Sequence, residues 1–340
     1  METHQYISDL GLENSSARLL PAGTVCLSRT ASVGFVVQMG VPMATSQDFV
    51  NWVCGPNLDP NYLRYLLMSE QETVRRVAYG TTHQTMYYPD AKALHALLPH
   101  LRQQRAIAEV LGALDDKIAA NTRVALSSAE MMQSLVPTLC SDLGWAPLSQ
   151  IAINPKVTIS PSAMGAVAHF SLPAFDAGEV PAPDSGESIM SGKQVVAAPS
   201  VLLSRLNPRI PRVWDVPEMP DKQAVASGEF MVLEPIDMPT GLLWALLSQP
   251  SVTDRLQEMA RGTSGSHQRV HPNDALSIQV PDARALSDDH KSVFASLSRK
   301  RATLRTESRR LADLRDTLLP HLMSGRLTVR QAERAASDAL

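Results

Sequence analysis

Two short segments combine a glycine with polar side chains whose types suit hydrogen bonding to DNA bases. Gly80 begins one segment and Gly262 begins the other, and each contains a histidine followed by a glutamine. Glutamine can form a bidentate pair with adenine, and serine or threonine can reach bases or phosphates. A plain turn that ends a helix is the structural alternative. We predict DNA contact for the polar residues of both segments: Thr81, Thr82, His83, Gln84, Ser264, Ser266, His267 and Gln268.

A basic run interrupted by prolines follows a predicted strand at residues 201–204. It is the most positive stretch of an acidic region, and arginine can read guanine or bind phosphate. Ser28 and Arg29 hold the equivalent position at the strand predicted in residues 23–28. Arg261 and Arg269 flank the second glycine segment. A solvated loop is the alternative interpretation. We predict DNA contact for Ser28, Arg29, Arg205, Asn207, Arg209, Arg212, Arg261 and Arg269.

Histidines and aspartates imitate metal-binding motifs without completing them. His267 and His271 have the i, i+4 spacing of a metal-binding helix, but no carboxylate lies between them and a proline follows. Pro89-Asp90 with Asp115-Asp116-Lys117 imitates a nuclease pattern. Asp115 lies on a predicted heptad helix, however, where a solvated face or one docked to a partner is the ordinary role. We expect no metal site and no catalytic residue.

Two Asn-Pro pairs resemble the beginning of an adenine methyltransferase motif. Asn154-Pro155-Lys156 and Asn207-Pro208-Arg209 both lack the second proline and the aromatic residue that complete it. No glycine-rich loop for phosphate or S-adenosylmethionine accompanies them. The missing catalytic motifs favour a recognition protein over an enzyme.

The sequence repeats itself imperfectly at a very long period. Two glycine segments, Gly80 and Gly262, lie 182 positions apart, as do Pro99 and Pro281. A period of this length indicates two whole domains rather than a solenoid of small repeats. Two similar surfaces suit a partner that is itself two-fold, such as duplex DNA. The other repeated pairs are Val25–Arg29 with Val201–Arg205, and Ser134–Leu139 with Thr317–Leu322.

Two long helices with apolar seams are predicted, one at residues 102–135 and one at 288–319. Polar Asn121 and Ser128 interrupt the first seam, and Lys300 and Glu307 interrupt the second. About 33 residues give a rod of about 50 Å, and the DNA helical repeat is about 34–36 Å. We expect the helices to pair and to hold two reading domains apart. The predicted core positions are Ile107, Leu111, Leu114, Ile118, Leu297, Leu304, Leu311 and Leu318.

Shorter elements are predicted from local patterns. Residues 23–28 and 49–53 are β-rich, and Pro60–Val77 has an apolar helical stripe that Gly80 would end. Residues 173–192 are dense in proline and glycine, which is typical of an exposed loop. The charged tail after Gly325 is predicted to fray.

Composition excludes several classes of protein. The 340 residues are 44% apolar, and no run of about 18 apolar residues predicts a membrane span. The first residues lack the pattern of a signal peptide, and three distant cysteines fit reduced thiols in the cytoplasm.

Charge is distributed unevenly along the chain. Residues 1–140 carry 10 basic and 12 acidic side chains, a net −2; residues 141–283 carry 9 and 15, a net −6; residues 284–340 carry 12 and 7, a net +5. Because DNA affinity depends heavily on phosphate neutralisation, we expect focused basic loops or a partner that supplies phosphate contacts.

Several of these segments resemble the specificity subunits of Type I restriction–modification systems. The resemblance covers essentially the whole chain and is most specific in the helices. Compared with the second copy, the first recognition domain is shorter at its N-terminus by roughly 30–50 residues. The second helix lacks a Gln-Arg-Ala-Ile-like beginning. The matching segments are Pro99–Leu111, Leu114–Ile118, Leu318–Leu327, Gly80–Thr82 and Gly262–Ser264.

The resemblance implies an α/β (α+β) protein with two target-recognition domains and a pseudo-twofold axis. The long helices would pair as an antiparallel coiled coil. The implied domains are residues 1–99 (first recognition domain, N-terminally shortened), 100–140 (first conserved helix), 141–283 (second recognition domain) and 284–340 (second conserved helix and tail).

The resemblance also implies partners. Each recognition domain would read one half of a split double-stranded DNA site, in the major groove. The coil would set the spacing and bind two methyltransferase subunits, which methylate adenine with S-adenosylmethionine. Translocase–nuclease subunits, which use ATP and Mg²⁺, would join for restriction. The specificity subunit itself would hold no cofactor.

Two alternatives stay open at this point. The first is a defective or regulatory adaptor that binds methyltransferase subunits without full recognition, because its first domain is short. A stand-alone metal-dependent nuclease acting through Asp90 and Asp115 is the other alternative.

Overall fold

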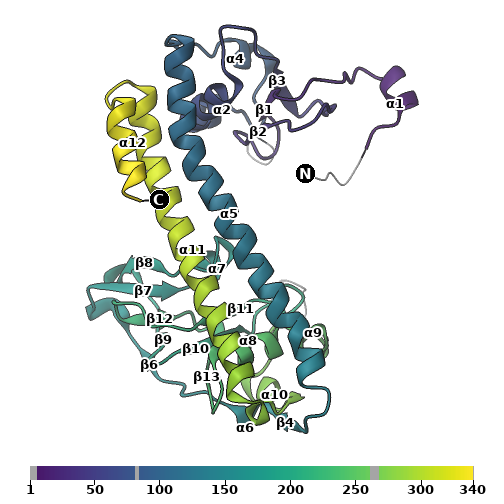
Figure 1. The fold of residues 1–340 in the computed structure, drawn as a ribbon, viewed down its shortest axis with the longest axis vertical. Helices are drawn as coiled ribbons and strands as arrows, with labels where there is room; N and C mark the ends of the chain where they lie inside the picture. Colours follow the sequence, from purple (N-terminus) through teal and green to yellow (C-terminus); the bar gives the residue numbers. More distant parts are fainter. Residues whose placement is uncertain (1–5, 81–83, 261–267, 340) are drawn as a thin grey trace. The chain divides into compact units, whose positions relative to one another are not determined.

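The computed structural model describes residues 6–80, 84–260 and 268–339. It divides into two compact units, residues 1–117 with 311–340 and residues 118–310. Both long helices contribute to each unit: α5 (Leu101–Leu139) and α11 (Asp288–Met323). Figure 1 labels the elements, and the units are described separately below.

A three-stranded antiparallel sheet forms the centre of the first unit. Its order is β2 (Val36–Gln38), β1 (Val25–Ser28), β3 (Phe49–Trp52), which confirms the strands predicted at residues 23–28 and 49–53. Every residue of β1 is buried. Leu27 lies opposite Val36 on one side and Val50 on the other.

Short helices cover one face of this sheet. Asp59 caps α2 (Pro60–Ser69) by accepting hydrogen bonds from two backbone amides, and α3 (Gln71–Arg76) follows directly. The prediction of one helix ended by Gly80 was wrong: the helix is interrupted at Glu70 and ends at Arg76, before the glycine is reached. The remaining short helices of this unit are α1 (Asp9–Glu13), α4 (Tyr88–Lys92) and α12 (Val329–Ser337).

The tail after Gly325 is ordered, so the prediction that it frays was wrong. Thr328 and Gln331 form a reciprocal capping box at the beginning of α12. Ala332 and Ala336, four residues apart on one face of the helix, are buried. The charged residues of the tail dominate its sequence, and the buried face of α12 was not predicted because its apolar side chains are small alanines.

The second unit contains a sheet with the same central arrangement. Its strand order is β11 (Val213–Val216), β10 (Ser200–Ser204), β13 (Phe230–Pro235) and β5 (Ala152–Ile153). All five residues of β10 are buried. Helices α8 (Thr240–Leu247) and α9 (Pro250–Met259) pack into the core beside it, with short elements β4 (Trp145–Pro147), α6 (Leu148–Ile151), α10 (Pro272–Leu276), β14 (Gln279–Pro281) and η3 (Ala283–Ala285).

A second sheet, which we call the outer lobe, covers the other face of β10. Its order is β6 (Thr158–Ile159), β9 (Lys193–Val195), β12 (Ala224–Ala226), β7 (Ala166–Phe170), β8 (Ala182–Ser185), with η1 (Pro161–Ala163), α7 (Leu172–Asp176) and η2 (Gly186–Ser188) beside it. The prediction of a plain loop at residues 173–192 was therefore wrong. Proline begins α7 instead of disrupting structure.

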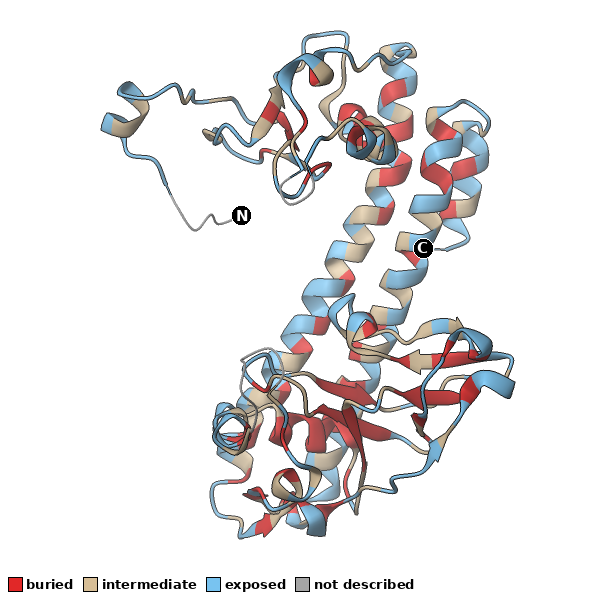
Figure 2. Cartoon of the chain, turned by 180° about the vertical axis from the view of Figure 1, so that it is seen from behind, coloured by how far each residue is buried: buried red, intermediate tan, exposed pale blue. Residues whose placement is uncertain are grey.

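Within each unit the long helices pack antiparallel, which confirms the predicted fold class. In the first unit, Leu111 and Leu114 of α5 are buried, as are Leu311 and Leu318 of α11. In the second unit, Met132 of α5 belongs to the same core cluster as α11 residues. Figure 2 shows the buried positions recurring along both helices. Ile107 and Leu304 are also buried, and Ile118 and Leu297 are half-buried.

Helix α11 approaches the second unit's core very closely at Gly241. A Cβ atom there would lie 2.6 Å from the Phe294 carbonyl oxygen and 2.6 Å from the Ser298 Cβ. Arg301 lies 4.3 Å over the Trp244 ring and makes an ion pair with Glu179 at 2.9 Å. A glycine and a buried arginine therefore fix the helix against this unit.

The structure shows no helix in its described part that is long and apolar enough to cross a membrane. The three cysteines, Cys26, Cys54 and Cys140, are free thiols. Burial raises the pKa of Cys26 to about 11, so it is a neutral thiol at neutral pH.

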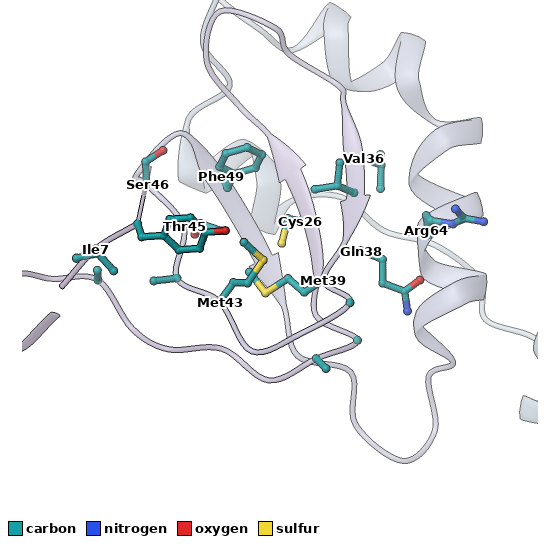
Figure 3. A pocket seen from close by; sticks show the side chains of 17 residues that line it. Ile7, Cys26, Val36, Gln38, Met39, Met43, Thr45, Ser46, Phe49 and Arg64 are labelled. Carbon is teal, nitrogen blue, oxygen red and sulfur yellow. The ribbon is translucent and has the colours of Figure 1, made fainter. Parts of the chain in front are cut away.

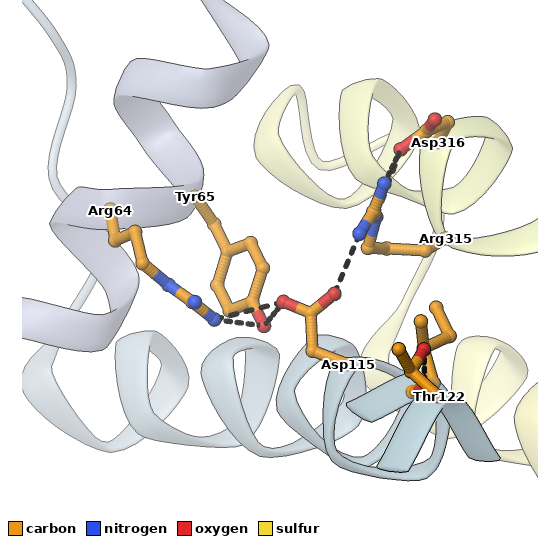
Figure 4. A network of polar contacts seen from close by, with 7 residues as sticks. Arg64, Tyr65, Asp115, Thr122, Arg315 and Asp316 are labelled. Atoms are coloured by element: carbon orange, nitrogen blue, oxygen red, sulfur yellow. Dashed lines mark hydrogen bonds and ion pairs between the residues drawn. The ribbon is translucent and has the colours of Figure 1, made fainter. Parts of the chain in front are cut away.

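A carboxylate on α5 joins three elements of the first unit (Figure 4). Asp115 accepts hydrogen bonds from the Tyr65 hydroxyl at 2.7 Å and from Arg64 at 3.0 Å, both on α2. Its other oxygen accepts from Arg315 of α11 at 2.7 Å. Burial and the bond to Asp115 raise the pKa of Tyr65, which therefore stays a donor.

We expect Asp115→Asn to destabilise the first unit by about 1–3 kcal/mol, because two guanidinium groups lose their anionic partner. Native-state hydrogen exchange of α2 and of residues 101–117 of α5 measures this loss. Asp116→Asn, at the exposed neighbouring position, is the matched control and should leave exchange unchanged. Equal effects of the two substitutions would contradict the proposed role of Asp115.

Candidate nucleic-acid interface

In the first unit, the end of the central strand is tied to the segment that follows Gly80. The Met86 amide donates to the Arg29 carbonyl at 2.8 Å, and the Ala31 amide donates to the Gln84 carbonyl at 3.1 Å. Thr30 and Thr85 form the bridge between these bonds. We call this arrangement the strand-end clasp. It places the residues after β1 beside the end of the first glycine segment.

The second unit contains the same clasp. The Val270 amide donates to the Arg205 carbonyl at 3.0 Å, and the Asn207 amide donates to the Gln268 carbonyl at 2.8 Å. Leu206 and Arg269 form the bridge. The two clasps thus bring together the two sets of residues that the sequence singled out separately.

The arginine at each strand end is held by the backbone. Arg29 donates through Nε to the Gln47 carbonyl at 2.8 Å, and Arg205 donates through Nη2 to the Gly228 carbonyl at 2.6 Å. Gln47 and Gly228 hold equivalent places before β3 and β13. Both guanidinium groups therefore position a turn, and each has further N–H groups beyond those bonds.

Carboxylates pair with two more of the predicted DNA-binding arginines. Arg212 makes a bidentate pair with Asp176 at 2.7 and 2.8 Å. Arg269 makes one with Glu229, with its shorter bond at 2.7 Å. These bonds hold the pKa of Asp176 and of Glu229 below their usual range. The basic run thus carries less free positive charge than its sequence indicates.

The remaining described candidates differ in exposure. Ser28 is buried and donates to the Ser32 carbonyl at 2.8 Å. Asn207 adopts a positive φ of 48°, and its Oδ1 has no hydrogen-bond partner among the described residues. Arg209 and Gln84 are exposed, and Gln268 is half-buried. Thr81, Thr82, His83, Arg261, Ser264, Ser266 and His267 lie outside the described residues.

Sequence reasoning missed an acidic residue at each clasp. Asp48 accepts from the Thr30 hydroxyl at 2.5 Å and from the Ser46 hydroxyl at 3.0 Å, and these bonds lower its pKa. Glu229 is its counterpart in the second clasp. The Arg29 amide donates to the Asp48 carbonyl, and the Arg205 amide donates to the Glu229 carbonyl, each at 2.8 Å. The sequence repeat could have revealed this pair of acids, because Asp48 and Glu229 each directly precede a phenylalanine at the beginning of a strand.

The residues of the imitated metal motifs have structural partners. Asp115 is occupied by two arginines and a tyrosine. Asp90 accepts from the Tyr87 amide at the beginning of α4, and His271 caps α10. Among the described residues no group of three or more potential ligands is suited to hold a metal ion.

Comparison with known proteins points to one family. Residues 2–126 match the Type I restriction modification DNA specificity domain. The specificity subunit of the Type I restriction enzyme MjaIX from Methanocaldococcus jannaschii is 28% identical over 114 residues. That match spans 33% of this chain and only 26% of the relative's length.

One solved structure shares the fold. The Type I restriction–modification S subunit from M. genitalium aligns over 90% of this chain and 84% of its own, with a TM-score of 0.53 and 18% identity. The HsdS subunit from Thermoanaerobacter tengcongensis aligns over 93% of this chain and 85% of its own, but its TM-score of 0.34 at 16% identity is too low to show a shared fold. Residues 2–126 are therefore similar to the DNA specificity domain of Type I restriction–modification systems, and the chain shares the fold of one S subunit.

Acidification should weaken the second clasp through Glu229. The pKa of Glu229 in the folded state lies below its usual value, so the ionised carboxylate stabilises the fold. This stabilisation is fully present at pH values above the usual pKa. It is lost as the pH falls through the lowered pKa. We expect Glu229→Gln to lower the urea midpoint at pH 7, with the difference from wild type shrinking below about pH 4. Trp214 and Trp244 fluorescence reports this unit. Exposed Glu218→Gln is the control, and a pH-independent effect would contradict the assignment.

Proposed function

We propose that this chain reads a two-part DNA site, one half with each clasp, for a methylating Type I complex. The observation that carries the proposal is the duplicated clasp. In both units the residues after the central strand are hydrogen-bonded to the end of a glycine-led polar segment. Two clasps of one construction suit two DNA half-sites read in the same manner, through the major groove.

Within each clasp, we assign different roles to the polar residues. Gln84 and Gln268 carry amide groups that can bind an adenine edge. Their backbone carbonyls are fixed by Ala31 and Asn207, so the side chains project from an ordered position. Arg209, with the predicted residues of the two glycine segments, completes the proposed surface. Arg29 and Arg205 support it by fixing the turns beside them.

The partners follow from the family and from charge. Residues 141–283 carry a net −6, and Arg212 and Arg269 are already paired. DNA phosphates therefore need cations from elsewhere. We assign this to methyltransferase subunits, two of them, which dock on the helical pair and bring S-adenosylmethionine. Translocase–nuclease subunits with ATP and Mg²⁺ complete the restricting complex.

We propose that the helical segments 100–140 and 284–340 set the distance between recognition domains 1–99 and 141–283. The buried leucines on both helices support this role, because a continuous apolar seam resists sliding. Polar Asn121 and Ser128 are buried in the same seam and favour one register.

The first test is a genome-wide map of N6-methyladenine after co-expression with the neighbouring methyltransferase subunit. A motif with specified bases on both sides of a fixed gap supports the proposal. A one-sided motif would limit reading to one unit. A stable complex without methylation would favour an adaptor that binds methyltransferase subunits but does not read a full site.

Gln84→Ala and Gln268→Ala should each relax one half of the motif. Loss of a bidentate base contact costs about 1–3 kcal/mol of discrimination, so the affected position should accept other bases while the opposite half stays unchanged. Each variant is thus the control for the other, and methylome sequencing measures both. Relaxation of both halves by one substitution would contradict separate reading.

A seven-residue insertion in each long helix should lengthen the gap of the methylated motif. Seven residues add about 10 Å of helix and keep the seam on the same face, which corresponds to about three base pairs. Insertion in one helix alone should abolish methylation, because the two seams no longer match. An unchanged gap with both insertions would refute the spacing role.

A further inference from the structure

The two central sheets correspond residue by residue. Leu27 lies opposite Val36 and Val50, as Leu203 lies opposite Val213 and Met231. The neighbouring residues point to the other face of each sheet. On that face, which we call the outer face, the first sheet has Cys26, Val37 and Phe49 where the second has Leu202, Trp214 and Phe230.

In the second unit the outer lobe covers the outer face completely. Phe170 of β7 packs edge-on against Trp214, with ring centroids 4.8 Å apart, and Phe230 completes the cluster at 6.2 Å from Trp214. Leu202, Trp214 and Phe230 are all at most 2% exposed. The lobe therefore supplies an aromatic side chain to an apolar sheet face that would otherwise contact water.

In the first unit the equivalent face borders a cavity of about 1190 Å³ (Figure 3). Cys26, Val37 and Phe49 line it, together with Met39 and Met43. Val37 is 48% exposed, whereas its counterpart Trp214 is 2% exposed. Part of the cavity therefore lies on the side of the sheet that the outer lobe covers in the second unit, and the cavity extends past strand β2 to Val36 and to Arg64 of α2.

The first unit also retains one strand position of an outer lobe. The Leu20 and Met43 backbones are paired, with N···O distances of 2.8 and 3.1 Å. In the second unit the Val196 amide donates to the Ala224 carbonyl at 3.1 Å. Val196 precedes β10 as Leu20 precedes β1, and Ala224 precedes β13 as Met43 precedes β3. Residues 43–45 therefore correspond to strand β12.

Strand β12 has neighbours on both sides: β9 antiparallel and β7 parallel. Phe170 stands on β7, opposite Ala226. Residues 43–45 have the Leu20 segment on one side, and no strand of the described part of the chain pairs with their other side. That edge borders the cavity, because Met43, Ala44 and Thr45 all line it.

We propose that this edge and cavity bind a β-strand of a partner polypeptide. The strand runs parallel to residues 43–45, as β7 does along β12, and inserts an aromatic side chain beside Cys26 and Phe49. Strand addition at an open edge satisfies backbone groups and gives specificity through one pocket. Valine at position 37 in place of tryptophan leaves room for a larger aromatic residue than phenylalanine.

The chain segment beside the cavity agrees with a polypeptide occupant. Tyr6, Ile7 and Val37 line the cavity and are 77%, 48% and 48% exposed. An apolar rim of this kind marks a protein-binding surface more than a site for a charged ligand. The proposal does not depend on DNA reading.

The test uses the full chain and a labelled peptide of its own residues 164–177, which contain β7 and α7. Fluorescence anisotropy should show saturable binding to the wild-type chain. A peptide with Phe170→Asp should bind at least about tenfold more weakly, because the aromatic anchor is lost. Absence of saturable binding by the native peptide would overturn the proposal.

Variants of the chain locate the binding. Val37→Asp places a charge in the cavity, and Ala44→Pro removes a backbone donor at the edge; both should abolish binding. Val53→Asp is the matched control, since Val53 is 59% exposed in the same unit and outside this cavity. Circular dichroism checks that each variant is folded, and Val37, already half exposed, can change without loss of core packing.

Sedimentation velocity distinguishes a different occupant. The wild-type chain alone should sediment as the same species at all concentrations. A concentration-dependent dimer that Val37→Asp abolishes would show that the face pairs with a second copy of the chain, and would overturn the proposal. Peptide binding that survives Val37→Asp would also overturn it.

Discussion

Each unit is organised around one strand that is buried on both faces. β1 and β10 have no exposed residue, so apolar side chains leave both sides of the strand and both sides require cover. Helices supply it on one side in both units. The second unit adds the outer lobe on the other side, whereas in the first unit that side borders a large cavity. Each clasp begins at the residue that directly follows one of these strands, Arg29 or Arg205.

The clasps show how an acidic protein holds basic residues in place. Arg29 and Arg205 donate hydrogen bonds to backbone carbonyls, while Arg269 forms an ion pair with Glu229. Ordering by hydrogen bonds lowers the conformational entropy that a loop must lose when it binds a ligand. The same bonds reduce free positive charge. The arrangement therefore favours a fixed orientation of these side chains over a large free positive charge.

The sequence was most informative where a pattern repeats with a strong physical cause. Heptad-spaced apolar residues predicted α5 and α11, because burial of one face dictates that period, and short β-rich runs predicted β1 and β3. It failed where small or polar residues decide the structure. The buried face of α12 consists of alanines, and prolines inside the outer lobe begin a helix rather than a loop.

The candidate site was only partly predictable for a similar reason. Residues of the glycine segments and strand ends were found one by one, but the backbone bonds that join them link positions more than fifty residues apart. No local pattern encodes such pairing. The Asp48 and Glu229 positions were visible in the repeat, yet their pairing with Thr30 and Arg269 depends on the fold. Asp115 resembled a nuclease residue because the arginines that neutralise it lie on other helices.

Charge on α11 follows the same principle. The net +5 of residues 284–340 suggests a free basic surface. Yet Arg301 and Arg305 bind Glu179 within the second unit, and Arg315 binds Asp115 within the first. Arginine makes these links because its planar donors satisfy a carboxylate while its stem packs on apolar surface. This part of the basic charge therefore holds the packed elements of each unit together and is already paired with carboxylates.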